Sequence, residues 1–255
     1  MKLASWNVNS LKVRLPHVLD WLTEHQPDIL GLQEIKTIDE NFPQGEIEAA
    51  GYQVNFAGQK TYNGVAVISK LPATDIVTDL PGLDDPQRRV LGCTVGDVRF
   101  LNLYVPNGSE VGSEKYEYKL GWLDALIKYV KCQLTEYKNF VVVGDFNITP
   151  DDRDLWDPVG WKDKILASPP ERAALQKLLS LGLTDTFRLF EQEENLYSWW
   201  DYRAAGFRRN NGMRIDLLLS SPAMTERCIA SYIDKEPRKL ERPSDHAPVV
   251  AEFID

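Results

Sequence analysis

Histidine and cysteine are scarce in this 255-residue sequence, and each shortage excludes a class of site. The three histidines, His17, His25 and His246, are too few for a multi-histidine zinc centre, so any metal site must use mostly oxygen ligands. The three cysteines lie far apart and form no CxxC pair. An odd number of isolated cysteines favours reduced thiols in a cytoplasmic protein over a disulfide framework.

Long apolar segments and an excess of positive charge are also missing. No run approaches the roughly 18 apolar residues of a membrane-spanning helix, and the N-terminal MKLASWN lacks the apolar core of a signal peptide. The net charge of −9 argues against a protein that coats nucleic acid non-specifically. An acidic enzyme can still bind DNA through one basic face. We therefore expect a cytoplasmic protein without membrane contact.

The patterning that is present is typical of a globular α/β protein. Apolar spacing predicts a helix that Ser10 caps and that continues to about Leu22, with further helices at Glu114–Glu136 and about Pro170–Leu181. Short apolar runs predict strands at Lys2–Val8, Ile29–Glu34, Gln53–Ala57, Val65–Ser69, Val90–Val95, Val98–Val105, Phe140–Val143, Ile215–Leu219, Ile229–Lys235 and Val249–Phe253. Without a linker or repeat, residues 1–255 are expected to form one domain with two packed sheets and helices outside.

Polar residues recur where these strands end. They are Asn7, Asn9, Gln33, Glu34, Tyr104, Asn107, Asp145, Asn147, Asp216, Asp245 and His246. Taken singly, most have a plain structural explanation as turn residues or solvated strand ends. Asp216 is harder to explain in this way, because an aspartate inside the apolar run IDLLL needs a partner if it is buried. Together the set predicts a pocket of carboxylates, amides and one imidazole at one edge of the sheets.

Short motifs carry a family resemblance. They are SWNVNS at 5–10, LQEIK at 32–36, NGVA at 63–66, QRR at 87–89, YVPNG at 104–108, GDFN at 144–147, RID at 214–216 and SDH at 244–246. Their order resembles that of the exonuclease III-type apurinic/apyrimidinic endonucleases, within the endonuclease/exonuclease/phosphatase superfamily. The resemblance implies a DNase I-like, four-layer α/β sandwich with two central mixed sheets. It also implies a Mg²⁺- or Mn²⁺-dependent phosphodiesterase, expected to be monomeric, that acts on damaged duplex DNA.

The resemblance assigns the metal to Glu34, with Asn7 and Asp245 beside it. Hard oxygen ligands of this kind suit Mg²⁺, which also binds substrate phosphate. Whether one or two metals act stays open, and a second site would use Asp145, Asn147 and His246. Asn9 is not counted as a firm ligand, because some relatives carry aspartate there.

The resemblance also implies catalytic roles. Asp145 matches the group that activates the attacking water, and Asn147 matches the residue that positions it. His246 matches a phosphate contact, and Asp216 the carboxylate that orients it and raises its pKa. Tyr104 matches a phenol near the scissile phosphate. The reaction would be in-line attack of water on phosphorus, which expels a 3′-oxygen.

DNA contacts are predicted from two further stretches. Trp199, Met213 and Ile215 resemble an apolar pocket for a flipped-out, base-less sugar, whereas Trp200 fits a core position equally well. Between Tyr202 and Ile215 the chain has four arginines and no acidic residue, which suits phosphate contacts. The arginines are Arg203, Arg208, Arg209 and Arg214, and the remaining predicted contacts are the pair Arg88 and Arg89, and Asn107.

Two other functions stay open. The catalytic set alone fits a superfamily phosphatase or phosphodiesterase that acts on a small molecule or a lipid, and the fold could also persist as a non-catalytic interaction protein. The arginine run, the QRR motif and the tryptophans favour DNA over the first alternative. No motif lacks its metal or base residue, which argues against the second. The sequence leaves undecided whether an internal abasic site, a blocked 3′ end or a plain 3′ end is the main substrate.

Overall fold

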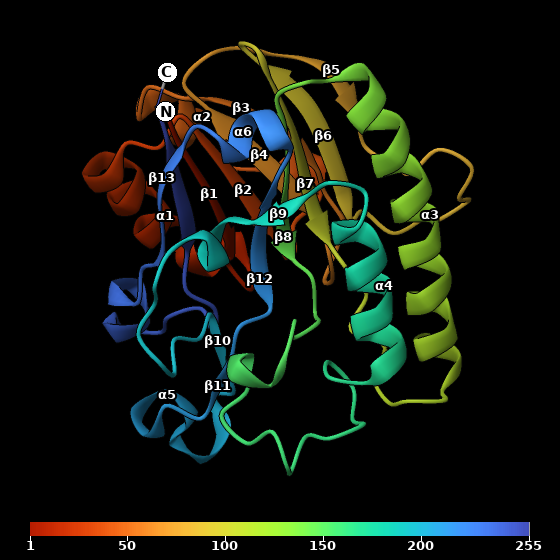
Figure 1. Ribbon diagram of the computed structural model, residues 1–255. Coiled ribbons are helices and arrows are strands. Elements are labelled where there is room, and N and C mark those ends of the chain that lie inside the picture. Colours follow the sequence, from red (N-terminus) through yellow and green to blue (C-terminus); the bar gives the residue numbers. More distant parts are fainter. Residues whose placement is uncertain (255) are drawn as a thin grey trace.

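Two six-stranded sheets pack against each other at the centre of the computed structural model, which describes residues 1–254 (Figure 1). The first sheet has the order β13-β14-β1-β2-β4-β3. Its strands are β1 (Lys2–Asn7), β2 (Ile29–Gln33), β3 (Gln53–Ala57), β4 (Val65–Ser69), β13 (Cys228–Ile233) and β14 (Val249–Phe253). β1 and β2 are parallel, whereas the other neighbours are antiparallel, so the sheet is mixed.

The second sheet has the order β5-β6-β7-β8-β12-β9. Its strands are β5 (Ala73–Val77), β6 (Val90–Val95), β7 (Val98–Tyr104), β8 (Phe140–Asp145), β9 (Thr184–Asp185) and β12 (Asp216–Ser220). Here β7 and β8 form the parallel pair. A separate two-stranded ribbon joins β10 (Trp199–Trp200) to β11 (Gly212–Met213).

The α-helices lie around the two sheets. They are α1 (Leu11–His25), α2 (Gln44–Ala49), α3 (Glu114–Glu136), α4 (Pro169–Leu179), α5 (Gly206–Arg209) and α6 (Pro222–Thr225). Helices α1 and α2 pack on the first sheet, and α3 and α4 pack on the second. A third apolar cluster fills the space between the sheets. The expected four-layer α/β sandwich with two central mixed sheets is therefore confirmed.

Strand β1 illustrates why short apolar runs become the central strands of this fold. Successive side chains of a strand point to opposite faces. Leu3 therefore joins the cluster between the sheets, whereas Ala4 and Trp6 pack toward α1. Because both faces are covered, a central strand must be apolar throughout and not only at alternate positions.

Most predicted elements appear within one or two residues of their expected bounds, and the helix Glu114–Glu136 appears with the expected bounds. Ser10 is the exception among the predicted caps. It occupies the N-cap position of α1, but its side chain makes no cap hydrogen bond, and its backbone is in an unusual conformation with φ 87°. Its N–H donates instead to the carbonyl of Glu34 at 2.8 Å. The loop after β1 is thus tied to the loop after β2, next to the predicted site.

Strand β5 escaped prediction. Its central residues Thr74, Asp75 and Ile76 are all exposed, so the segment shows neither an apolar run nor a clean alternation. It pairs only with β6, at the edge of its sheet. None of the described helices is both long enough and apolar enough to cross a membrane.

Candidate active site

Strand pairing brings the predicted polar residues to one edge of the sandwich. Asn7 ends β1, and Glu34 directly follows the parallel strand β2. In the second sheet Asp145, at the end of β8, is in register with Tyr104 of β7 on one side and with Asp216 of β12 on the other. The register of the strands therefore assembles residues that are up to about 200 positions apart in the chain.

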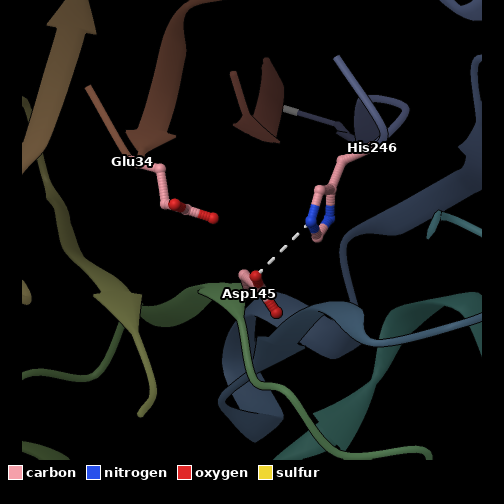
Figure 2. Close-up of side chains that lie close together, drawn as sticks. All are labelled: Glu34, Asp145 and His246. Carbon is pink, nitrogen blue, oxygen red and sulfur yellow. Dashed lines mark ion pairs between the residues drawn. The ribbon is translucent and has the colours of Figure 1, made fainter. Parts of the chain in front are cut away.

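Glu34, Asp145 and His246 form the centre of this edge (Figure 2). One ligand atom from each side chain lies within 4.8 Å of the others. Asp145 and His246 are only 1% and 4% exposed. No other group of three histidine, cysteine or acidic side chains in residues 1–254 meets this spacing. Two carboxylates so placed could hold a divalent cation.

The side chain of Asn7 links the two carboxylates. Its amide nitrogen donates to Glu34 Oε1 at 3.0 Å and to Asp145 Oδ2 at 2.9 Å. Its amide oxygen accepts the backbone N–H of Asn9 at 3.0 Å. Asn7 thus lies beside Glu34 as expected, but it presents a hydrogen-bond donor to the carboxylates and not an oxygen ligand.

His246 lies between two aspartates. Its Nδ1 donates to Asp216 Oδ2 at 2.9 Å, and its Nε2 lies 3.7 Å from Asp145 Oδ2. Burial alone would lower the pKa of the imidazole, but the charges of Asp216 and Asp145 outweigh it and raise the pKa to about 10. The imidazole is therefore a cation at neutral pH, and its orientation is fixed by Asp216.

At Asp145 the effect of burial on the pKa outweighs that of the neighbouring opposite charge, whereas at His246 the charges outweigh burial. Burial raises the pKa of its carboxyl to about 7, against the lowering effect of the His246 cation. Its Oδ1 accepts the backbone N–H of Asn147 at 2.9 Å. Asn107 donates to the side-chain oxygen of Asn147 at 3.2 Å. Burial, together with the charges of nearby carboxylates, also raises the pKa of Tyr104, which stays a neutral phenol.

Asp245 lies outside the central cluster. Its carboxylate accepts the side-chain amide of Asn9 at 2.9 Å and the indole N–H of Trp199 at 3.0 Å. Lys36 completes the chain of contacts, because its ammonium donates to Asn9 Oδ1 at 2.6 Å and lies 2.9 Å from Glu34 Oε2. Asp245 is thus connected to Glu34 through Asn9 and Lys36, and not by a shared ligand position.

Two residues with contacts to this site, Lys36 and Ser244, had no individual role in the sequence prediction. Lys36 pairs with Glu34. Arg89, predicted together with Arg88 as a DNA contact, stacks over the ring of Tyr104 with 4.9 Å between its guanidinium carbon and the ring centroid. Ser244 donates to the carbonyl of Asn7 at 2.6 Å and accepts the N–H of His246 at 3.2 Å. Each lies within a recognised motif, and the motif letters were the only available signal.

The residues of the predicted sugar pocket do lie together. Trp199, Met213 and Ile215 share one apolar cluster with Leu155 and Leu166. Met213 and Ile215 are 0% and 2% exposed, so they offer almost no surface to a ligand. The neighbouring Trp200 is fully buried and packs in a different cluster, as a core residue does.

The arginine run divides into two groups. Arg214, predicted as a phosphate contact, is buried: its guanidinium bonds Asp154 at 2.6 Å and Asp185 at 2.8 Å, so this prediction is wrong. Arg208 and Arg209, which belong to α5, are exposed, and neither forms an ion pair with the residues the structure describes. Helix α5 lies with β10 and β11 below the strand ends in the view of Figure 1.

Two more predicted DNA contacts already have acidic partners. Arg203 has an 89% exposed side chain that bonds Asp201 at 2.6 Å. Arg88 is 42% exposed and bonds Asp79 at 3.1 Å. Both could still reach a phosphate, but each would have to share its charge with a carboxylate.

Comparison with known proteins agrees with this geometry. The sequence model of the endonuclease/exonuclease/phosphatase family matches residues 4–246. The chain belongs to that family. Exodeoxyribonuclease III of Haemophilus influenzae is 37% identical, and the match covers 99% of this chain and all of that protein. The predicted resemblance to exonuclease III-type enzymes is therefore confirmed, and with it the prediction of a nuclease of DNA repair.

Two solved structures of family members are also close. A Neisseria 3′ phosphatase bound to a product DNA hairpin superposes with a TM-score of 0.98 at 48% identity, over the whole of both chains. An AP endonuclease from Archaeoglobus fulgidus gives a TM-score of 0.96 at 36% identity, again over both whole chains. The family therefore includes relatives of this chain whose names give different DNA substrates.

Proposed function

We propose that this family member is a Mg²⁺-dependent phosphodiesterase of duplex DNA that works mainly at 3′ ends. It would remove 3′ phosphates, other 3′ blocking groups and 3′ nucleotides, and would cut internal abasic sites more slowly. The observation that carries the proposal is the contact set of Glu34, Asp145 and His246, in which a base, a cation and oxygen ligands converge.

The donor set fits a small divalent cation. Glu34 and Asp145 offer carboxylate oxygens within 4.8 Å of each other, and oxygen is the ligand that Mg²⁺ prefers. Mn²⁺ has similar preferences and is the alternative. When bound, such an ion supplies positive charge that stabilises a departing phosphate-ester oxygen.

The residues of the chain supply the remaining chemistry. Asp145, with a pKa of about 7, can accept a proton from an attacking water near neutral pH. Asn7 and the backbone N–H of Asn147 hold its two oxygens in place. The His246 cation and the neutral Tyr104 phenol can donate to the phosphoryl oxygens, where negative charge develops.

A preference for 3′ ends follows from the walls of the site. Met213 and Ile215 are nearly fully buried, which leaves little room for an extruded sugar. A cleft of about 510 Å³ is lined by Tyr104, Asn107 and Lys115, among other residues. Such a cleft suits a DNA backbone. The relative at 48% identity is named a 3′ phosphatase, which supports the same preference.

One gel tests this proposal. Labelled duplexes that carry a nicked 3′ phosphate, a plain recessed 3′ end or an internal abasic analogue are incubated with Mg²⁺ or with EDTA. We expect turnover only with Mg²⁺, and the abasic duplex at least about 10-fold slower than the 3′ phosphate. Asp145→Asn, purified in parallel, controls for contaminating nucleases.

The outcomes separate the parts of the proposal. Fastest cleavage at the internal abasic site would refute the 3′-end preference and leave the nuclease assignment intact. Failure to process any duplex with Mg²⁺ or Mn²⁺ would refute the proposed function itself. We further propose that the chain works as one domain, as a monomer and in the cytoplasm. The three free cysteines support the cytoplasmic location.

A further inference from the structure

A buried ion pair joins helices α3 and α4, which lie side by side on the second sheet (Figure 1). Lys119 of α3 and Glu171 of α4 form it, and both side chains are 0% exposed. Lysine and glutamate are almost never fully buried unless they are paired. Burying the two charges removes them from water, and such pairs often contribute little net stability. Another reason for this pair is therefore needed.

Lys119 reaches the loops that follow β7 and β8. Its ammonium donates to the carbonyl of Asn147 at 2.6 Å and to the carbonyl of Asn107 at 3.2 Å. Asn147 has a left-handed backbone with φ 49°, and its N–H holds the carboxylate of Asp145. Lys119 therefore fixes a residue in the left-handed region whose backbone N–H orients the proposed base.

Glu171 reaches the other wall of the site. Its carboxylate accepts the N–H of Leu166 and the N–H of Ser168, both at 3.1 Å. Leu166 also has a left-handed backbone, with φ 70°, which is costly for a bulky side chain. Its side chain packs in the apolar cluster that contains Trp199.

A helix-capping role explains only part of this arrangement. Glu171 and Ser168 do form a capping box at the start of α4. A capping box requires neither a buried lysine nor the N–H of Leu166. Gly108 shows how closely the lysine is packed, because a Cβ added there would lie 3.1 Å from Lys119 Cδ.

We propose that Lys119 and Glu171 are positioning residues that hold both walls of the active site, the Asn147 loop and the Leu166–Ser168 loop, in register with each other. The inference rests on the proposed function only for its activity readout. Loss of the pair should displace Asn147 and Asp145 without removing any group that touches substrate.

The test compares a paired apolar replacement with a matched control. Lys119→Met/Glu171→Met replaces both charges with side chains of similar length, so the core stays filled. Arg99→Met removes another buried cation, which bonds Gln133 at 2.7 Å near the far end of α3. Arg99 lies at the opposite end of β7 from Tyr104. Thermal unfolding, kcat and KM on a 3′-phosphate duplex, and amide hydrogen exchange are measured for each protein.

We expect the paired variant to fold and to lose about 10²-fold in kcat, the size that a misplacement of about 1 Å produces. KM should change by less than about threefold. The amides of Asn147, Leu166 and Ser168 should exchange at least about 10-fold faster. Arg99→Met should keep its kcat even if its melting temperature falls.

A paired variant with kcat within about threefold of wild type and unchanged exchange would overturn the proposal. If that variant does not fold, Glu171→Gln gives the same readouts, because it keeps the shape and loses only the charge. Wild-type protein without activity on any DNA would instead count against the proposed function, and the exchange measurement would still report on the loops.

Discussion

Two regions of the molecule differ in how their charged side chains are exposed and paired. They are the strand-end cluster, which consists of Glu34, Asp145 and His246, and the arginine loop, residues 202–214. In the cluster, Asp145 and His246 are almost fully buried and have fixed partners on several sides. In the arginine loop, Arg208 and Arg209 are exposed. Burial shifts the pKa values of the first group, to about 7 and about 10. Exposed charges are instead screened by salt over about 10 Å at 0.1 M.

This difference in burial suits the two regions to different tasks, catalysis in the strand-end cluster and DNA binding in the arginine loop. A proton acceptor needs a tuned pKa and a fixed position, which only a buried, hydrogen-bonded setting provides. A phosphate contact needs an exposed cation that can displace the counterions condensed on the DNA. Changes in the strand-end cluster should therefore affect rate steps and metal binding, and changes in the arginine loop should affect affinity and its dependence on salt.

The largest effect is expected from Asp145→Asn. The amide keeps the size of the side chain but cannot accept the proton of the attacking water. The single-turnover rate should fall by about 10²–10⁴-fold, with DNA binding nearly unchanged. Rapid-quench measurement on a 3′-phosphate duplex checks the rate, and a binding titration in Ca²⁺ checks the affinity. A rate near that of wild type would remove Asp145 as the base.

Glu34→Gln should affect metal affinity first. Glu34 is the one member of the central cluster at the end of β2, and its loss removes a charged oxygen ligand. Even residues that only support metal ligands change affinity by about 10–100-fold, so a loss of at least that size is expected. Calorimetric titration with Mg²⁺ and Mn²⁺ measures it. Binding like that of wild type would contradict the assignment of Glu34 as a ligand.

His246 should make stability depend on pH. Its folded-state pKa, about 10, lies above the ordinary value of 6.5, so the stabilisation is complete below about pH 6.5 and is lost as pH rises toward 10. Its size is on the order of a few kcal/mol. The wild-type protein should have a larger free energy of unfolding than His246→Gln, and this difference should shrink between about pH 6.5 and pH 10. Urea unfolding in the presence of EDTA measures it.

An Asp145→Asn background in both proteins removes the second titrating carboxyl. The pH window over which this stabilisation is lost then narrows from its upper end, since one of the charges that raise the His246 pKa is gone. A difference that stays constant from pH 6.5 to 10 would show that His246 is not held as a cation in the folded protein.

The strand-end cluster could be predicted from the sequence because the pattern that marks each of its positions is local. A strand such as β8 is uniformly apolar until it leaves the sandwich, so the first acidic residue, Asp145, marks the edge. The pairing of His246 with Asp216 came from matched motifs and not from spacing. The two residues are 30 positions apart and meet only through the fold.

Burial of charge was the part that the sequence did not reveal. Arg214 lies in the same run as Arg208 and Arg209, yet its partners Asp154 and Asp185 come from other segments. Lys119 has the same limitation. It lies on an amphipathic helix where a lysine is ordinarily solvated, and its partner Glu171 is 52 positions away. Nothing local distinguishes a paired charge from a solvated one.

The smallest effect is expected in the arginine loop, from Arg208→Ala/Arg209→Ala. If both residues contact phosphates, the plot of log K against log salt should flatten by about one unit for each lost contact. Affinity should fall to a similar extent for duplexes of different sequence, because phosphate contacts carry no base information. The binding is measured in an Asp145→Asn background with Ca²⁺, so that the DNA is not consumed.

Arg203→Ala provides the control from the same loop. Its guanidinium is also exposed but already bonds both carboxylate oxygens of Asp201. Its charge is therefore largely compensated, and fewer counterions are released when it meets DNA. We expect a smaller change in slope than for either Arg208 or Arg209 alone. If the double variant binds with unchanged affinity and slope, the two arginines are solvated surface, and the DNA must be held by other cations, such as those that line the cleft beside Tyr104.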